Sequence, residues 1–276
     1  MWQIRRVLAT TLCCALAAAA PSGSEAYDFA VSLARQGQRP AASAAERKAH
    51  QRVAARFRSV GLRVGYERFR VPGKGRSRNV IGIRDSAADC LVIAMAHADT
   101  VPPSPGAHDN ASGVGTLVAL ARSLATDPEP ACDVWLVATG SEERPYTKTP
   151  DHLGASALVT RLRNMNRLKD VKLALSLDEV GRGSRFDLHS TAPSPRADVE
   201  QRILDAGGDK VRYVKDPQGE GNSDHRELAR AGAPAAKLGV PSEPCRHTAC
   251  DTPDRLQRTA FTHVLRIVWP LLRTWR

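Results

Sequence analysis

Aromatic residues are scarce in this sequence, and internal repeats and long low-complexity segments are absent from it. Aromatic side chains make up 5% of the 276 residues. The lack of a repeat excludes the repeat architectures, in which one structural unit stacks on the next. Hydrophobic residues at 42% and charged residues at 25% describe an ordinary globular protein with a sizeable core. The length is within the range of a single α/β domain.

Nucleic-acid-binding motifs are also absent, although the formal net charge of +11 would suit a polyanionic partner. The 40 lysines and arginines are scattered along the chain instead of forming a cluster, and few aromatic side chains are available. We therefore expect no nucleic-acid partner. The charge is interpreted as a solvated basic surface, suited to the vicinity of anionic cell-envelope polymers.

Long apolar runs are missing from the chain, except near its start. Arg5 and Arg6 precede the apolar run 7–20, which is shorter than the roughly 20 residues that cross a bilayer comfortably. A basic start, a short apolar run and small residues after it are typical of a secretory signal peptide. The alternative interpretation is an uncleaved anchor.

We predict that residues 1–26 are a signal peptide and are removed, leaving residues 27–276 as one domain. The candidate cleavage sites are the segment Ser24–Ala26 and the alanines near Ala19. No later segment has the apolar length of a membrane span. The mature protein is therefore expected to be soluble and either secreted or periplasmic.

Cysteine is used sparingly, and no pair has the CxxC spacing of a structural zinc site. Cys13 and Cys14 leave with the signal peptide. The four that remain are Cys90, Cys132, Cys245 and Cys250. An even number in an oxidising compartment suggests disulfides, and four cysteines allow three pairings. Four free thiols, or a cysteine-type zinc site, are the alternatives.

The sequence context favours one of these pairings. Cys90 and Cys132 each open an apolar run, so they can bridge if those runs are neighbouring parallel strands. Cys245 and Cys250 flank a short loop and would pair locally. We therefore predict the disulfides Cys90–Cys132 and Cys245–Cys250.

Helical and strand patterns alternate along the rest of the chain. Apolar positions three and four residues apart predict helices, and continuous apolar runs predict strands covered on both faces. Helices are predicted at 43–61, 112–125, 152–165, about 197–206, after 223 and from about 253; strands are predicted at 62–71, 78–84, 90–96, 134–140, 171–177, 210–216 and 234–240. This alternation implies an α/β sandwich with a largely parallel central sheet.

Acidic and histidine side chains follow three of the predicted strands and occupy two of the loops. They are His97 and Asp99 after 90–96, Glu142 and Glu143 after 134–140, Asp178 after 171–177, Asp109 ahead of a helix, and His247 ahead of the last helix. The carboxyl ends of parallel strands meet at one edge of a sheet, where sites gather. Each residue alone has an ordinary explanation, such as a structural histidine, a helix cap or a surface glutamate. Their convergence on one edge favours a functional site.

The residue types in this set match a two-metal centre. Two imidazoles and three carboxylates without a thiolate suit Zn²⁺, and they suffice for two ions that share one carboxylate. Two ions about 3.5–4 Å apart hold a bridging water as hydroxide and polarise a carbonyl. Cations between them would also stabilise the adjacent carboxylates of Glu142 and Glu143, whose like charges otherwise repel.

From about Pro40 to the C-terminus the chain resembles the co-catalytic di-zinc peptidases, which include bacterial leucyl aminopeptidases, glutamate carboxypeptidases and glutaminyl cyclases. The resemblance rests on "AHADT", "GAHDNASGVGTLVALAR", "SEE", "LDEVG", "SDH" and "HTACDT", in that order. It implies a three-layer α/β sandwich with a mixed, largely parallel central sheet flanked by helices, two bound Zn²⁺ and a peptide substrate.

The resemblance also implies a role for each residue of the set. The metal ligands would be His97, Asp109, Glu143, Asp178 and His247, with Asp109 bridging both ions. Glu142 would be the general base, and Asp99 would orient His97. A cis peptide bond would join Asp109 to Asn110.

One loop departs from the family pattern. Many relatives place a Gly-Ser pair soon after the double glutamate, whereas residues 144–152 intervene here before "LGAS". This loop is expected to overhang the site, so the preferred substrate residue does not follow from the resemblance. The lid and dimerisation domains of some relatives are absent, and we expect a minimal single-domain enzyme, with a monomer favoured.

Neighbouring residues receive milder predictions. Asp224 and His225 either line the substrate pocket or fix their loop, Glu179 serves packing or charge balance, and Asp251 braces the His247 loop. The remaining histidines are interpreted as surface or structural: His50, His108, His152, His189 and His263.

The leading functional hypothesis is an exported zinc aminopeptidase that removes N-terminal residues from peptides. A carboxypeptidase or dipeptidase is the second hydrolase hypothesis. A glutaminyl cyclase, an acyltransferase of the same fold, is a third, and the complete set of five ligands argues against it because cyclases commonly depart from that set. A binding protein without turnover is the non-enzymatic alternative.

Overall fold

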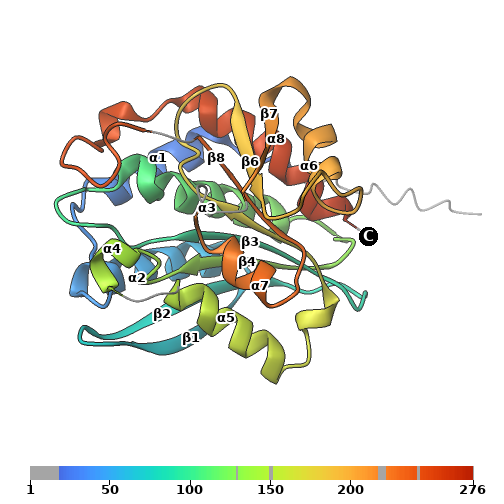
Figure 1. Ribbon diagram of the computed structural model, residues 1–276, viewed down its shortest axis with the longest axis horizontal. Coiled ribbons are helices and arrows are strands. Elements are labelled where there is room, and N and C mark those ends of the chain that lie inside the picture. The colour runs from blue at the N-terminus through green and yellow to red at the C-terminus, as the bar shows by residue number, and fades with distance from the viewer. Residues whose placement is uncertain (1–18, 129, 149–151, 217–221, 241–242, 276) are drawn as a thin grey trace, which may run out of the picture.

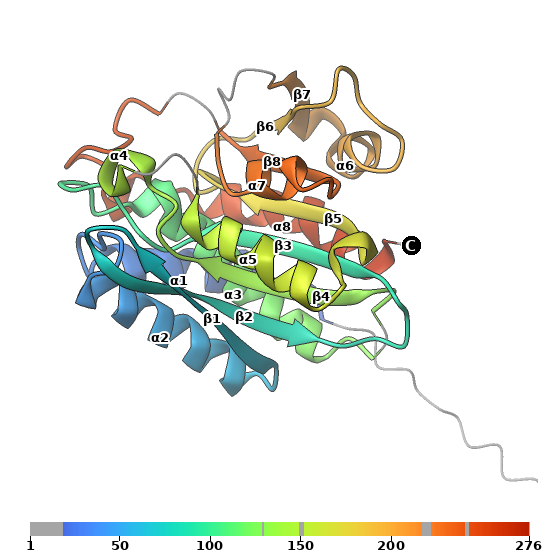
Figure 2. The ribbon, with the colours of Figure 1, turned by 60° about the horizontal axis from the view of Figure 1, so that its bottom comes forward.

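The computed structural model describes residues 19–128, 130–148, 152–216, 222–240 and 243–275. Within these residues an eight-stranded mixed sheet lies between two layers of helices, as Figures 1 and 2 show. The predicted α/β three-layer sandwich is therefore confirmed. The apolar run at residues 7–18 lies outside the described residues.

The central sheet has the strand order β1-β2-β4-β3-β5-β8-β6-β7. Strands β4, β3, β5 and β8 run parallel to one another. The neighbouring pairs β1–β2, β2–β4 and β8–β6 are antiparallel. The bounds are β1 Arg63–Val71, β2 Gly75–Arg84, β3 Leu91–His97, β4 Asp133–Thr139, β5 Val171–Leu177, β6 Phe186–Ser190, β7 Val211–Lys215 and β8 Ala235–Gly239. The carboxyl ends of β3, β4 and β5 consequently lie side by side.

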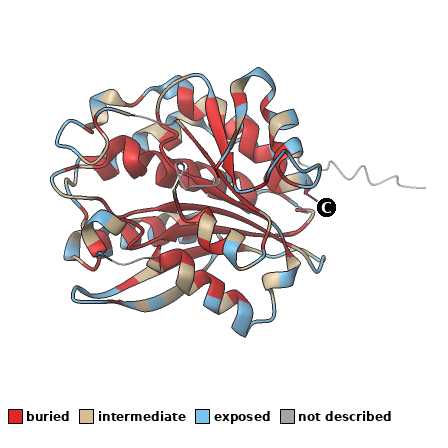
Figure 3. Ribbon diagram, in the orientation of Figure 1, coloured by how far each residue is buried: buried red, intermediate tan, exposed pale blue. Residues whose placement is uncertain are grey.

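Strand β3 shows why the middle of the sheet is apolar throughout. Its side chains alternate between the two faces: Val92, Ala94 and Ala96 join one buried cluster, and the residues between them join the other. Both clusters are sealed by helices, so every residue of β3 and β4 is buried (Figure 3). A strand covered on both faces reads as a continuous apolar run, as predicted.

The helices divide between these two faces. Helices α1, α3 and α8 pack on one another over one face, with α2 and α6 beside them, while α5 and α7 cover the other face (Figure 2). The bounds are α1 Gly23–Ala34, α2 Ala44–Ser59, α3 Ser112–Ala125, α4 Arg144–Thr147, α5 Leu153–Asn164, α6 Glu200–Gly207, α7 His225–Arg230 and α8 Arg258–Thr274. No helix among the described residues is long and apolar enough to cross a bilayer.

The first disulfide follows from the register of the sheet. Strands β3 and β4 are parallel with Leu91 opposite Asp133, so the residues just before them are neighbours. Cys90 and Cys132 occupy those positions and are bonded, with 4.9 Å between their Cα atoms. The predicted pairing is confirmed, and it lies at the end of these strands opposite to the candidate site.

Several elements differ from their predicted bounds. Helix α1 and strand β6 were not predicted; α6 begins at Glu200 instead of about 197; and α8 begins only at Arg258, after a single 3₁₀ turn at Pro253–Arg255. A capping signal for α1 is nevertheless present, because the Ser22 hydroxyl accepts a hydrogen bond from the Glu25 amide.

Helix α1 bears on the cleavage sites considered for the signal peptide. The segment Ser24–Ala26 forms its first turn, and Ala26 is fully buried in the packing between α1, α3 and α8. Cleavage there would cut this helix, whereas cleavage near Ala19 would leave it whole. We therefore favour the second site as a proposal.

Candidate metal centre

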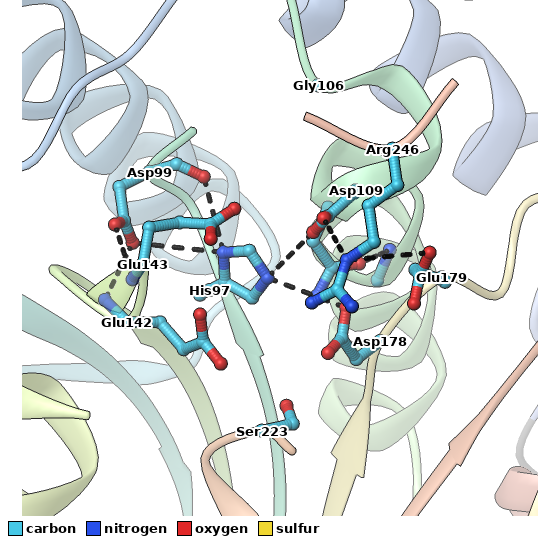
Figure 4. Close-up of polar contacts among 12 residues, drawn as sticks. His97, Asp99, Gly106, Asp109, Glu142, Glu143, Asp178, Glu179, Ser223 and Arg246 are labelled. Carbon is cyan, nitrogen blue, oxygen red and sulfur yellow. Dashed lines mark hydrogen bonds and ion pairs between the residues drawn. The ribbon is translucent and has the colours of Figure 1, made fainter. Parts of the chain in front are cut away.

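The five residues predicted as metal ligands meet at the carboxyl edge of β3, β4 and β5. Asp109 lies in the kinked, non-helical part of the segment Ala107–Ala111, and its two oxygens face different histidines (Figure 4 shows the contact with His97). Oδ1 lies 3.1 Å from Nε2 of His97, and Oδ2 lies 3.2 Å from Nε2 of His247. Each of these histidines also has a second carboxylate nearby. Asp178 Oδ1 lies 3.5 Å from His97 Nε2, and Glu143 Oε2 lies 3.0 Å from His247 Nε2.

These atoms have the chemistry and the unmet bonding capacity of a metal site. Asp109 Oδ1, Glu143 Oε1, Asp178 Oδ1 and His247 Nε2 are buried and have no hydrogen-bond partner among the described residues. Buried polar atoms are nearly always satisfied, so a group of orphaned ligand atoms calls for a cation. Imidazole nitrogens and carboxylate oxygens suit Zn²⁺. The residues present therefore fit two ions that share Asp109.

Glu142 also lies close enough to serve as a ligand. The ligand atoms of His97, Glu142 and Asp178 lie within 4.8 Å of one another, as do those of His97, Asp109 and Glu143. Proximity alone thus leaves both adjacent glutamates available to a metal. The histidines nearest to them distinguish them, because Glu143 Oε2 lies 3.0 Å from the imidazole of His247 whereas Glu142 Oε1 lies 3.5 Å from the imidazole of His152.

The protonation of the centre reflects its crowded charges. Burial, and then the charge of Asp109, raises the pKa of Glu143 to about 7, and burial raises the pKa of Glu142 well above its usual range. Burial acts to lower the pKa of His247, but the nearby carboxylates of Asp109 and Glu143 prevail and raise it to about 10. Raised pKa values thus favour protons among these crowded carboxylates, a role that a bound cation would take over.

Asp99 holds three residues of the site in place. Its carboxylate oxygens accept hydrogen bonds from the backbone amides of Glu142 and Glu143, each at 3.1 Å. Its backbone carbonyl lies 3.2 Å from Nδ1 of His97, whereas its nearest carboxylate oxygen is 3.8 Å from that nitrogen. Orientation of His97 therefore runs through the carbonyl, and the carboxylate fixes the double glutamate.

The backbone around Asp109 is held from the C-terminal part of the chain. The Asp109–Asn110 peptide bond is cis, as the resemblance implies. Asp251 was predicted to brace the His247 loop, and it ties that loop to the Asp109 segment: its carboxylate accepts hydrogen bonds from the amides of His108, at 2.8 Å, and Asp109, at 3.0 Å. The loop that carries His247 thus clamps the segment that carries the shared carboxylate.

Comparison with known proteins agrees with this arrangement. Residues 79–272 match the pattern of peptidase family M28, which covers more than half of the chain. The chain belongs to peptidase family M28.

Individual relatives within and around the family are distant. Aminopeptidase YwaD of Bacillus subtilis is 29% identical over 195 residues, which cover 66% of this chain and 41% of YwaD. The chain thus spans about two fifths of the length of that curated relative. Among solved structures, BSAP, a zinc aminopeptidase from Bacillus subtilis, is similar with a TM-score of 0.79 at 18% identity, covering 90% of this chain and 93% of BSAP.

A second solved structure belongs to a protein with a different named activity. A glutaminyl cyclase from Bacteroides thetaiotaomicron, bound to N-acetylhistamine, has a TM-score of 0.77 at 19% identity, covering 94% of this chain and 100% of the cyclase. At such low identity these likenesses establish the shared fold alone.

Two cations lie among the acidic residues of this M28 centre, and neither was predicted. Lys237, buried on β8, has its ammonium 3.0 Å from Asp178 Oδ2 and 3.4 Å from Glu179 Oε2. Arg246 Nε lies 3.1 Å from Asp109 Oδ2 and 3.9 Å from Glu179 Oε1 (Figure 4). Burial acts to raise the pKa of Asp178, but Lys237 holds it well below its usual range. Glu179 thus serves charge balance, as predicted.

A buried glutamate on α2, Glu46, holds the backbone at Ser141, just before Glu142 and Glu143. Glu46 accepts hydrogen bonds from the Ser141 amide, at 3.0 Å, the Ser77 hydroxyl, at 2.8 Å, and the Ala42 amide, at 2.8 Å. Ser141 has a φ of 56°, a left-handed conformation that a serine adopts only when its surroundings enforce it. Ser43 and Glu46 have the spacing of a capping box, which suggested a helix start and not this second role.

The residues Asp224 and His225 are both fully buried beside β4 and β8. Asp224 Oδ2 accepts a hydrogen bond of 2.5 Å from the Thr139 hydroxyl at the end of β4, so it fixes its loop. Both ring nitrogens of His225 lack a hydrogen-bond partner among the described residues. Of the histidines interpreted as surface or structural, His152 departs most from that prediction, because it contacts Glu142.

The second disulfide shapes the loop that presents His247. Cys245 and Cys250 are bonded, as predicted, with 5.2 Å between their Cα atoms. Between them His247 has a φ of 59°, in the left-handed region that non-glycine residues seldom occupy. The small closed loop therefore confines this histidine in a conformation that a free loop would rarely visit.

We expect loss of the Cys245–Cys250 disulfide to lower both Zn²⁺ affinity and stability, and loss of the Cys90–Cys132 disulfide to lower stability alone. Replacing Cys245 and Cys250 together by serine should weaken Zn²⁺ binding and lower the free energy of unfolding by about 2 kcal/mol, from the short loop that is opened. The matched control replaces Cys90 and Cys132, which lie at the far end of the strands; it should cost about 4 kcal/mol and leave Zn²⁺ affinity unchanged. Titration calorimetry and chemical denaturation measure both quantities. Equal Zn²⁺ affinity in the two variants would contradict this expectation.

Proposed function

We propose that this M28 chain is a two-zinc aminopeptidase that removes N-terminal residues from peptides. His97 and Asp178 would hold one ion, His247 and Glu143 the other, and Asp109 would bridge them. The observation that carries this assignment is the division of Asp109, whose two oxygens lie 3.1 Å and 3.2 Å from separate histidines. The zinc aminopeptidase among the structural neighbours supports it.

The residues around the centre suit peptide-bond hydrolysis. Bound zinc supplies a Lewis acid that polarises the scissile carbonyl and makes water a stronger nucleophile at neutral pH. In this proposal Glu142 accepts a proton from the attacking water and returns it to the leaving amine. Its backbone amide is fixed by Asp99.

Export from the cytoplasm is part of the proposal. Two disulfides tie the described residues, and such bonds persist mainly in oxidising compartments. The sequence before helix α1 has the pattern of a signal peptide. We therefore propose a secreted or periplasmic enzyme.

A glutaminyl cyclase is the competing activity, supported by the cyclase among the structural neighbours. The complete set of two histidines and three carboxylates favours hydrolysis instead. A carboxypeptidase or dipeptidase would use the same centre and differ in which terminus of the substrate it requires.

A panel of short peptides separates these activities. The purified protein with Zn²⁺ should release chromophore from aminoacyl p-nitroanilides and shorten peptides with a free amino terminus, and N-acetylation of the same peptides should abolish cleavage. Cleavage that instead requires a free carboxyl terminus would favour a carboxypeptidase. Loss of ammonia from N-terminal glutamine peptides without hydrolysis would favour a cyclase. Either result would overturn the aminopeptidase assignment.

A further inference from the structure

The imidazole of His152 lies between two carboxylates that come from different parts of the fold. Its Nε2 is 3.5 Å from Glu142 Oε1, and its Nδ1 is 3.2 Å from Glu227 Oε1. All three residues are buried, and His152 is only 1% exposed. His152 precedes the first residue of α5, and Glu227 lies on α7, so two helices fix the position of the ring.

Glu227 sets the orientation of this ring. Its Oε1 lies 3.2 Å from His152 Nδ1, and because an ionised carboxylate only accepts hydrogen bonds, this contact favours the tautomer with the proton on Nδ1 and leaves Nε2 facing Glu142. Glu227 is itself held by Arg230, whose Nη1 donates to the same Oε1 at 2.9 Å. The carboxylate behind the imidazole is thus fixed, and the ring in front of it has one orientation.

The adjacent glutamate, Glu143, faces a different histidine. Glu143 directs Oε2 at His247 on the metal side, whereas Glu142 directs Oε1 at His152 on the side of α5 and α7. Adjacent side chains of the same type therefore have different histidine partners. The difference matches the two roles in the proposed function, a ligand and a proton acceptor.

We propose that His152 is a positioning residue for Glu142: with its ring held by Glu227, it lies beside Oε1, keeps the Glu142 carboxylate in place for proton transfer and keeps it from serving as a metal ligand. This inference rests on the proposed function, in which Glu142 is the base. A misplacement of about 1 Å in a reacting group costs up to about 10²-fold in rate, which sets the size of effect to expect.

The variants His152→Ala, His152→Gln and Glu227→Gln test the inference. His152→Ala should lower kcat by about 10- to 10²-fold, with KM within about twofold and two zinc ions still bound. His152→Gln keeps a polar group within reach of Glu142 and should recover most of the turnover. Glu227→Gln weakens the backing and should give a smaller loss. Thermal unfolding of each variant identifies any that fail to fold. If His152→Ala does not fold, the turnover of His152→Gln and Glu227→Gln still tests the inference.

A double variant shows whether His152 acts through Glu142. In the Glu142→Gln background, His152→Ala should cost nothing further, because the group that it positions is no longer a base. Independent, multiplicative losses would overturn the inference, as would unchanged kcat in His152→Ala or loss of zinc along with activity. The proposed function is tested separately by Glu142→Gln alone: if that single variant keeps full activity, the base role and this inference both fail.

Discussion

Removal of metal ions is expected to abolish peptide hydrolysis without unfolding the protein. Lewis-acid activation supplies several kcal/mol of transition-state stabilisation, so turnover should fall by at least about 10³-fold after dialysis against a chelator. Addition of Zn²⁺ or Co²⁺ should restore it, with activity reaching a plateau at about two ions per chain. Metal analysis by mass spectrometry and circular dichroism of the metal-free protein provide the measurements.

The retained fold is the control for this experiment. The core clusters on both faces of the sheet and both disulfides are independent of the ions. A metal-free sample that is folded but inactive supports the proposed centre. Full activity in a rigorously metal-free sample would contradict it, and a plateau at one ion per chain would contradict the bridging role of Asp109.

Substitution of the two adjacent glutamates should give two different losses. Glu142→Gln keeps the shape of the side chain and removes its basicity, so we expect two bound metals and a turnover lower by at least about 10²-fold. Glu143→Ala removes a ligand, so zinc content itself should fall, with partial recovery of activity at high Zn²⁺ concentration. Zinc stoichiometry measured alongside turnover for both variants separates a base from a ligand.

The opposite pattern has a definite meaning here. If Glu142→Gln loses zinc and Glu143→Ala retains it, the roles are reversed, which the proximity of Glu142 to His97 and Asp178 would then explain. If neither substitution changes turnover or zinc content, these residues are ordinary polar residues at the end of β4.

The sheet and the convergence of the five candidate ligands were predictable from the sequence. Strands β3 and β4 are buried on both faces and therefore appear as continuous apolar runs. Their order and direction bring His97 and Glu143 to one edge, because parallel neighbours end together. Helix α3 was recognisable from its spacing of apolar residues, and Gly113 near its start also meets a steric demand. A Cβ at that position would lie 2.1 Å from the Leu177 carbonyl at the end of β5.

The supporting contacts were not predictable, because each joins residues far apart in the sequence. Glu46 and Ser141 are 95 residues apart, and His152 and Glu227 are 75 apart. A buried polar side chain looks the same in a sequence as an exposed one until the fold supplies its partner. Two signals were nevertheless present. Lys237 interrupts the apolar segment of β8, and His152 ends the loop in which the chain departs from its relatives.

The cations of the centre have a consequence for how the ions enter it. Arg246 lies at the same Asp109 oxygen that faces His247, and Lys237 neutralises the outer oxygen of Asp178. If the proposed centre binds zinc, metal uptake would be a cation exchange, in which the incoming ion competes with the guanidinium of Arg246 for Asp109. The free energy of the displaced contacts is subtracted from that of coordination. The affinity of the proposed centre for zinc would thus depend in part on Arg246, an arginine outside the proposed ligand set.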